Sequence, residues 1–271
     1  MKERLDLRLV REGCFPSRER ARAAVMAGLV YVNGERVDKA GHFVEETAEI
    51  AIKGPDCPYV SRGGLKLEKA LEVFGLDPKG AVAMDVGAST GGFTDCMLQK
   101  GAARVYAVDV GYGQLDYKLR NDSRVVNMEK VNFRYLDPAS VPEAMDLVTI
   151  DVSFISLNLV FPVAAALMKE GGHLIALVKP QFEAGREQVG KGGIVRDAAV
   201  QQQVLEKVLD YGRRAGLAPC GLDFSPVKGA KGNVEFLLHL TKGPERSGEP
   251  AFQSPGEVAA RAASAFRKED S

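Results

Sequence analysis

Short apolar runs alternate with amphipathic segments along residues 60 to 243. The runs have the length and the β-branched content of strands, and the segments between them repeat apolar residues at helical spacing. We expect strands at Ala81–Met84, Arg104–Val108, Val125–Met128, Asp146–Asp151, His173–Val178, Leu217–Phe224 and Val234–Leu240. We expect one helix that ends at Phe74. Four more are expected at Phe93–Lys100, Gln114–Arg120, Ser156–Lys169 and Asp197–Ala215. This alternation predicts an α/β fold with a mostly parallel sheet that helices cover on both faces.

A different pattern precedes the sheet. Two helices are expected at Arg4–Glu12 and Ser17–Ala27, the second ended by Gly28. Asn33-Gly34 joins two β-leaning runs, which is a strong hairpin signal. We expect these strands at Leu29–Val32 and Glu35–Val37, with a further one at Ala48–Ile52. Residues 1–59 are therefore predicted to form a small α+β domain and its linker.

The remaining residues divide at about position 243. We assign 60–243 to the sheet domain. Residues 244–271 are rich in Pro, Gly, Ser and Glu, which is typical of a loose tail, and a last helix is expected at Glu257–Arg267.

The composition is that of a soluble globular protein, with no net charge over 271 residues. No apolar run approaches the roughly 20 residues that span a bilayer, and the charged N-terminus lacks the apolar core of a signal peptide. We therefore expect a cytoplasmic protein without membrane contact. The four cysteines are far apart and no histidine pairs with them at metal-binding spacing, so neither a disulfide framework nor a metal site is expected.

The stretch DVGASTGGFTD, residues 85–95, lies between a predicted strand and a predicted helix. Its glycines let the backbone turn sharply and approach a ligand, and the helix start offers free N–H groups. A structural loop is the plain alternative. However, Asp109 ends the next strand about 20 residues later, where an acidic residue suits a ribose diol.

The nature of the cofactor follows from the charges around this turn. The spacing G-x-x-x-G-G differs from the G-x-G-x-x-G of NAD enzymes, and Asp85 at the strand tip would repel a pyrophosphate. A cofactor with a ribose and no phosphate fits better, which points to S-adenosylmethionine. The candidate cofactor residues are Asp85, Gly87, Ala88, Ser89, Gly91, Gly92 and Asp109, with Glu129 or Asn132 facing the adenine.

The N-terminal string SRERARAAVMAGLVYVNGERV resembles the small RNA-binding module of a primary-binding protein of the small ribosomal subunit and of many pseudouridine synthases. Residues 1–24 contain seven basic and four acidic residues, which agrees with an RNA-facing surface although a solvated charged face would look the same. The resemblance implies that shape rather than sequence is read, through phosphates. It makes Arg18, Arg20, Arg22 and Asn33 the candidate RNA-binding residues.

The motifs VSRGGLKL, DVGASTGGFTD, DVSFISL, LVKPQFE and GNVEF occur in the order that resembles the TlyA-type branch of the ribose methyltransferases related to FtsJ, a branch also called haemolysin A. The resemblance implies a Rossmann-like methyltransferase fold with a seven-stranded sheet. It implies S-adenosylmethionine-dependent 2′-O-methylation of ribose in ribosomal RNA. The expected nucleoside is cytidine, in one or both ribosomal subunits. The family's catalytic Lys, Asp, Lys and Glu fall on Lys66, Asp151, Lys179 and Glu235.

The chemistry agrees with that catalytic set. A ribose 2′-hydroxyl is a poor nucleophile until its proton is removed or polarised, and the displacement needs alignment rather than a metal. Lys179 is the group expected on the 2′-oxygen, either as a neutral base or as a charged partner of the alkoxide. Asp151 is expected near the methyl group, with Lys66 and Glu235 orienting the ribose.

Three rival functions differ in what they require. An NAD-dependent reductase requires another glycine spacing. A non-catalytic RNA-binding or ribosome-assembly factor has no need of the four catalytic residues. A membrane-lytic haemolysin requires a long apolar or strongly amphipathic segment, which we do not find.

Overall fold

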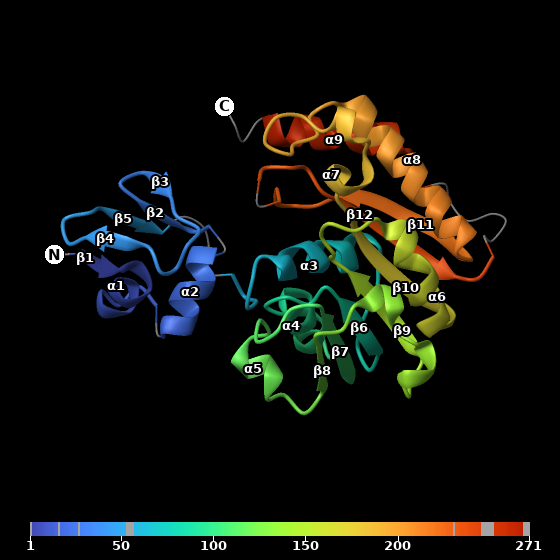
Figure 1. The fold of residues 1–271 in the computed structure, drawn as a ribbon, viewed down its shortest axis with the longest axis horizontal. Helices are drawn as coiled ribbons and strands as arrows, with labels where there is room; N and C mark the ends of the chain where they lie inside the picture. The colour runs from blue at the N-terminus through green and yellow to red at the C-terminus, as the bar shows by residue number, and fades with distance from the viewer. Residues whose placement is uncertain are drawn as a thin grey trace.

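The computed structural model describes residues 2–15, 17–26, 28–52, 57–229, 231–244 and 252–267. Figure 1 shows a small N-terminal domain in blue beside a larger domain built on a twisted sheet. The predicted linker at 56–59 is described from Cys57 onward, and the tail residues 245–251 and 268–271 lie outside the described residues.

The N-terminal domain has a hydrophobic core of its own. Leu5 and Leu9 of one helix pack with Val25 of the next and with Val30 and Val44 of the strands. Asn33 (φ 52°) and Gly34 (φ 82°) form the predicted hairpin turn. The elements are β1 (Lys2–Arg4), α1 (Leu5–Arg11), α2 (Arg18–Met26), β2 (Val30–Val32), β3 (Glu35–Arg36), β4 (Phe43–Glu45) and β5 (Ile50–Ile52). The β1–β4 pair was not predicted, because three-residue strands leave too short a pattern.

The second domain contains a seven-stranded sheet in the order β11-β12-β10-β9-β6-β7-β8. The strands β6 to β10 run parallel, which confirms the predicted mostly parallel sheet. Strand β12 is antiparallel to both of its neighbours, β11 and β10, and its pairing with β10 was not predicted. The strands are β6 (Val82–Val86), β7 (Arg104–Asp109), β8 (Val125–Glu129), β9 (Met145–Ile150), β10 (Met168–Val178), β11 (Leu217–Phe224) and β12 (Phe236–Lys242).

Helices cover both faces of this sheet (Figure 1). Between the helices and the sheet lie two clusters of buried apolar residues. Ala83 of β6 belongs to the cluster under α3 and α4, whereas Met84 belongs to the cluster under α6 and α8. A central parallel strand buried on both faces is the reason that β6 is almost continuously apolar. The helices are α3 (Gly63–Val73), α4 (Gly92–Gln99), α5 (Tyr117–Arg120), α6 (Phe161–Leu167), α7 (Pro180–Glu183), α8 (Ala198–Arg214) and α9 (Pro255–Arg267).

The helix expected at Ser156–Lys169 is shorter than predicted. A 3-10 turn at Leu157–Leu159 precedes α6, which begins with Pro162 in its first turn, where a missing N–H costs nothing. Met168 is already extended and starts β10. None of the described helices has both the length and the apolarity to cross a membrane.

Acid should destabilise the sheet domain through a buried histidine pair. Burial, and after it the neighbouring His173, lower the pKa of His239 to about 4. The Nδ1 of His173 lies 3.1 Å from the Nε2 of His239. Between pH 6.5 and 4 the unfolded chain then binds a proton that the folded chain excludes, so stability falls by up to about 3 kcal/mol as the pH is lowered. Urea unfolding at pH 7.5 and 5 should show about 2 kcal/mol of this loss. It should shrink in His239→Gln and persist in the exposed-histidine control His42→Gln.

Candidate active site

The carboxyl ends of β6 and β9 adjoin at the point where the strand order reverses, the usual ligand position in such sheets. The predicted turn connects β6 to α4 there. Asp85 is buried beneath the turn rather than standing at its rim: it accepts hydrogen bonds from Thr94 N (2.9 Å) and Thr94 Oγ1 (2.7 Å). Burial raises its pKa to about 7. These hydrogen bonds from Thr94 hold the first turn of α4 against Asp85.

The three glycines of the turn leave no room for a side chain. Gly87 has φ 87°, and a Cβ on it would lie 2.6 Å from the backbone oxygen of Asp151. On Gly91 it would lie 2.3 Å from Leu119, and on Gly92 2.3 Å from Ser61 Oγ. The glycines therefore let β6 and α4 approach the neighbouring loops, a role that was not predicted from the sequence.

Gly87→Ala should weaken cofactor binding. The added Cβ meets the backbone of Asp151 rather than a side chain that could move, so the turn itself must shift. We expect calorimetry to show at least about a tenfold higher Kd for S-adenosylmethionine, since the strain is of the order of 1–3 kcal/mol. Gly80→Ala is the control, because Gly80 also has a positive φ but has open space at its Cβ. Equal affinities of the two variants would contradict the role of the close approach.

Asp109, at the end of β7, is a carboxylate held in place by backbone donors. Its Oδ2 accepts from Ser89 N (2.8 Å) and its Oδ1 from Gly111 N (2.7 Å). It faces a hollow of about 750 Å³ that Gly87, Ser89, Asn132 and Asp151 also line.

The two alternative adenine-facing residues have different surroundings. Glu129 is paired with Arg120 and accepts from Gly113 N (2.8 Å), so it braces the loop after β7. Asn132 lines the hollow and accepts from Arg134 N (3.2 Å). The geometry favours Asn132 over Glu129 as the residue that faces a ligand.

Two lysine–carboxylate pairs stand beside the turn. Lys179 Nζ, at the end of β10, lies 2.6 Å from Asp151 Oδ1 and 3.0 Å from Ser153 Oγ. Lys66 Nζ, on α3, lies 2.6 Å from Glu235 Oε2, just before β12. Four motifs that are distant in the sequence are thereby brought to one edge of the sheet.

The four groups also interact electrostatically. Burial would raise the pKa of Asp151, but the ammonium groups of Lys66 and Lys179 outweigh it and lower that pKa. Burial likewise opposes the charge on Lys66, yet Asp151 and Glu235 raise its pKa. Asp151 is therefore ionised and Lys66 charged at neutral pH, and each of the two groups stabilises the charge of the other.

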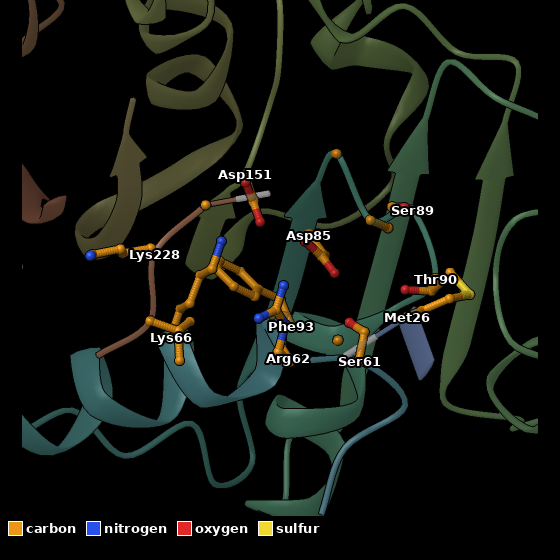
Figure 2. A pocket seen from close by; sticks show the side chains of 16 residues that line it. Met26, Ser61, Arg62, Lys66, Asp85, Ser89, Thr90, Phe93, Asp151 and Lys228 are labelled. Carbon is orange, nitrogen blue, oxygen red and sulfur yellow. The ribbon is translucent and has the colours of Figure 1, made fainter. Parts of the chain in front are cut away.

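A second hollow, of about 220 Å³, adjoins the first at Gly87 and contains Lys66 and Asp151. Figure 2 shows Arg62 and Lys66 rising from the start of α3 toward Asp151, with Met26 of α2 beside Thr90. Arg62 was not predicted. It is half-buried, and its pKa is lowered by burial and by Arg36. Its place in the motif SRGG, next to Lys66 on the helix, was the only signal for it in the sequence.

Two further buried residues support the site and were also not predicted. Glu183 accepts from Ser156 Oγ and Leu157 N, both at 2.7 Å, and so joins the motif LVKPQFE to the loop after Asp151. Asn233 accepts from Val195 N (3.0 Å) and donates to Gly193 O (2.8 Å). Both lie within motifs named above, Glu183 in LVKPQFE and Asn233 in GNVEF.

The candidate RNA-binding residues all lie on the N-terminal domain. Three of them, Arg18, Arg20 and Arg22, are on α2, and Asn33 is in the hairpin turn. Arg18 is half-exposed and pairs with Asp6 at 3.0 Å. Hydrogen bonds from Arg4 and Arg18 lower the pKa of Asp6 to about 2. Arg20 and Arg22 are exposed, and Arg20 reaches Cys57 O at 3.5 Å. Asn33 accepts from Glu49 N (2.9 Å), which gives it a structural contact within the domain. Over the described residues, no three His, Cys, Asp or Glu side chains are grouped as a metal site.

Comparisons with known proteins match both domains of the chain. The FtsJ-like methyltransferase family model matches residues 59–242, and the S4 domain model matches residues 3–50. A Bacillus subtilis protein provisionally named rRNA methyltransferase YqxC is 54% identical over 240 residues, 88% of this chain and 85% of that protein. The 16S/23S rRNA (cytidine-2′-O)-methyltransferase TlyA of Mycobacterium tuberculosis is 41% identical over 245 residues, 90% and 91% of the two chains. A solved structure from Streptococcus thermophilus, provisionally described as a hemolysin, has 50% identity and a TM-score of 0.79, and the match covers 99% of this chain and 98% of that one.

Proposed function

This chain belongs to the FtsJ-like methyltransferase family, and from that premise we propose that it transfers a methyl group from S-adenosylmethionine to the 2′-hydroxyl of a ribose in ribosomal RNA. The observation that carries the proposal is the meeting of the pairs Lys179–Asp151 and Lys66–Glu235 beside the glycine turn. A protein that only binds RNA has no need for two shielded lysine–carboxylate pairs at the edge of a cofactor-sized hollow.

The hollow beside Asp109 fits S-adenosylmethionine. The carboxylate of Asp109, fixed by Ser89 N and Gly111 N, is placed to accept hydrogen bonds from the ribose hydroxyls. Gly87 keeps the turn free of side chains, and Asn132 would face the adenine. When bound, the cofactor supplies an electrophilic methyl group on its sulfonium.

The chain's own residues have to orient the ribose and manage the proton of its hydroxyl. Lys179 Nζ would contact the 2′-oxygen, either to accept the proton or to stabilise the negative charge that develops on the oxygen. Asp151 holds the Nζ of Lys179 at 2.6 Å in either role, and Lys179 must be a neutral amine if it is to accept the proton. Lys66 and Glu235, held to each other at 2.6 Å, would position the ribose from the side of α3 and β12.

The substrate follows from the N-terminal domain and the relatives. An S4 domain with Arg20 and Arg22 exposed on α2 suits the phosphates of folded RNA. The mycobacterial relative is named for cytidine in both 16S and 23S rRNA. We therefore propose cytidine in the RNA of both ribosomal subunits as the substrate and the cytoplasm as the place of action.

Methyl transfer to separated ribosomal subunits tests the proposal. Purified protein, radiolabelled S-adenosylmethionine and unmethylated 30S or 50S subunits should give labelled RNA. Nuclease digestion should then yield label on the ribose of a cytidine. Label on a base would contradict the ribose assignment, and no label on either subunit, with cofactor binding intact, would favour an RNA-binding role.

Membrane lysis is the second candidate, because the similar streptococcal structure is described as a hemolysin. It can be tested directly with the same protein. Dye release from liposomes in the absence of RNA would support lysis, whereas intact liposomes at concentrations that saturate methylation would exclude it.

A further inference from the structure

Helix α9 is joined to the helix that carries Lys66 by a buried ionic network. Asp223, on β11, is 4% exposed, and its Oδ2 lies 3.2 Å from Lys69 Nζ on α3. Its Oδ1 lies 3.6 Å from the guanidinium of Arg261 on α9 and accepts no hydrogen bond from the described part of the chain. Arg261 also donates to Gln253. A single buried carboxylate therefore links α3 to α9.

The network reaches the catalytic set through α3. Lys69 follows Lys66 by three residues, so the two side chains lie on the same side of the helix. Lys69 Nζ donates to Phe224 O at 2.6 Å and lies 4.0 Å from the centre of the Phe224 ring. Because Lys69 is held in this way, the rotation of α3 is fixed at the point where Lys66 meets Glu235.

A second connection runs through Phe266 of α9. Its ring stands edge-on to the Phe224 ring, with centres 6.0 Å apart, and Lys228 Nζ lies 5.2 Å from its centre. The next residue, Gly229, is so close to the site that a Cβ on it would lie 2.4 Å from Glu235 Oε1. The loop that Lys228 anchors therefore lies directly against the carboxylate that pairs with Lys66.

We propose that α9 is a positioning element for the Lys66–Glu235 pair, with Arg261 acting through Asp223 and Lys69, and Phe266 through Lys228. Stability alone does not explain the network, since apolar residues often replace a buried ion pair at no cost, and α9 already buries Val258 and Ala262. What charged groups add is a fixed orientation. A test of this proposal by methylation kinetics rests on the proposed function, whereas a test by chemical labelling of lysines does not.

The first test is kinetic and uses Arg261→Met and Asp223→Asn. We expect kcat for RNA methylation to fall about tenfold, with KM for RNA and Kd for S-adenosylmethionine unchanged, because a misplaced group slows the chemical step. Arg214→Met is the matched control, since Arg214 also pairs with an aspartate, Asp210, and lies over an aromatic ring. In a Glu235→Gln background, Arg261→Met should cause no further loss. Folded variants with wild-type kcat, or an equal loss in both backgrounds, would overturn the inference.

The second test needs no methylation. An amine-reactive ester labels exposed, mobile lysines, and mass spectrometry reports the rate at each one. Lys66 should be labelled several-fold faster in Arg261→Met than in the wild type, because its contact with Glu235 loosens. Lys179 is the internal control, since it contacts Asp151 and Ser153 rather than Glu235. Unchanged labelling of Lys66, or equal acceleration at Lys179, would overturn the inference even for a protein without methyltransferase activity.

Discussion

Lys179→Ala should lower kcat for ribose methylation at least about a hundredfold, the usual contribution of a group that handles the proton of the nucleophile. Lys179 Nζ is held between Asp151 Oδ1 (2.6 Å) and Ser153 Oγ (3.0 Å) at the end of β10. Whether it acts as base or as partner of the alkoxide, alanine leaves no group to do either. The Kd for S-adenosylmethionine should stay unchanged, because Asp109 and the glycine turn remain. Methyl transfer under single-turnover conditions and calorimetry measure the two quantities.

Lys169→Ala is the control for this variant. Lys169 also pairs with an aspartate at 2.6 Å, and it lies on the same strand, β10, but near the opposite end. Its loss should leave kcat at the wild-type level. If Lys179→Ala also retained wild-type kcat, Lys179 would have no part in the reaction and another group would have to contact the 2′-oxygen.

The sheet could be predicted because its strands are buried on both faces. The apolar runs at Ala81–Met84, Arg104–Val108 and His173–Val178 correspond to β6, β7 and β10. The helix expected at Asp197–Ala215 corresponds to α8, and the structure shows that the side chain of Asp197 caps it. Strands β1 and β4 lacked such signals, and Pro162 moved the start of α6 without interrupting its apolar pattern.

The candidate site was predicted only as far as its motifs reach. Lys66 and Glu235 are 169 positions apart, and only their order within known motifs indicated that they meet. Asp85 was expected at the rim because it ends an apolar run, yet the hydrogen bonds from Thr94 hold it beneath the turn. The contacts that link α9 to α3 could not be predicted, because they arise from tertiary packing and no local sequence pattern encodes them.

Deleting residues 1–52 should abolish methylation of ribosomal subunits while the sheet domain still binds S-adenosylmethionine. The N-terminal domain has its own core around Leu5, Leu9 and Val25, and the two clusters of the sheet domain contain none of its residues. The truncated protein should therefore fold. It loses Arg20 and Arg22, and because phosphate contacts supply much of the affinity for nucleic acids, kcat/KM should fall about a hundredfold or more.

The full-length variant Arg20→Ala with Arg22→Ala separates RNA docking from the shape of the site. If α2 supplies phosphate contacts, this variant should raise KM for the subunits, leave kcat unchanged, and weaken the dependence of binding on salt concentration by up to two counterions. Arg11→Ala is the matched control, since Arg11 pairs with Glu3 within the same domain.

The deletion has one effect that the double variant lacks, because it also removes Met26 from the hollow that contains Lys66. A kcat defect confined to the deletion would therefore show that the N-terminal domain completes the catalytic hollow, and a wild-type rate in both would exclude it from substrate recognition.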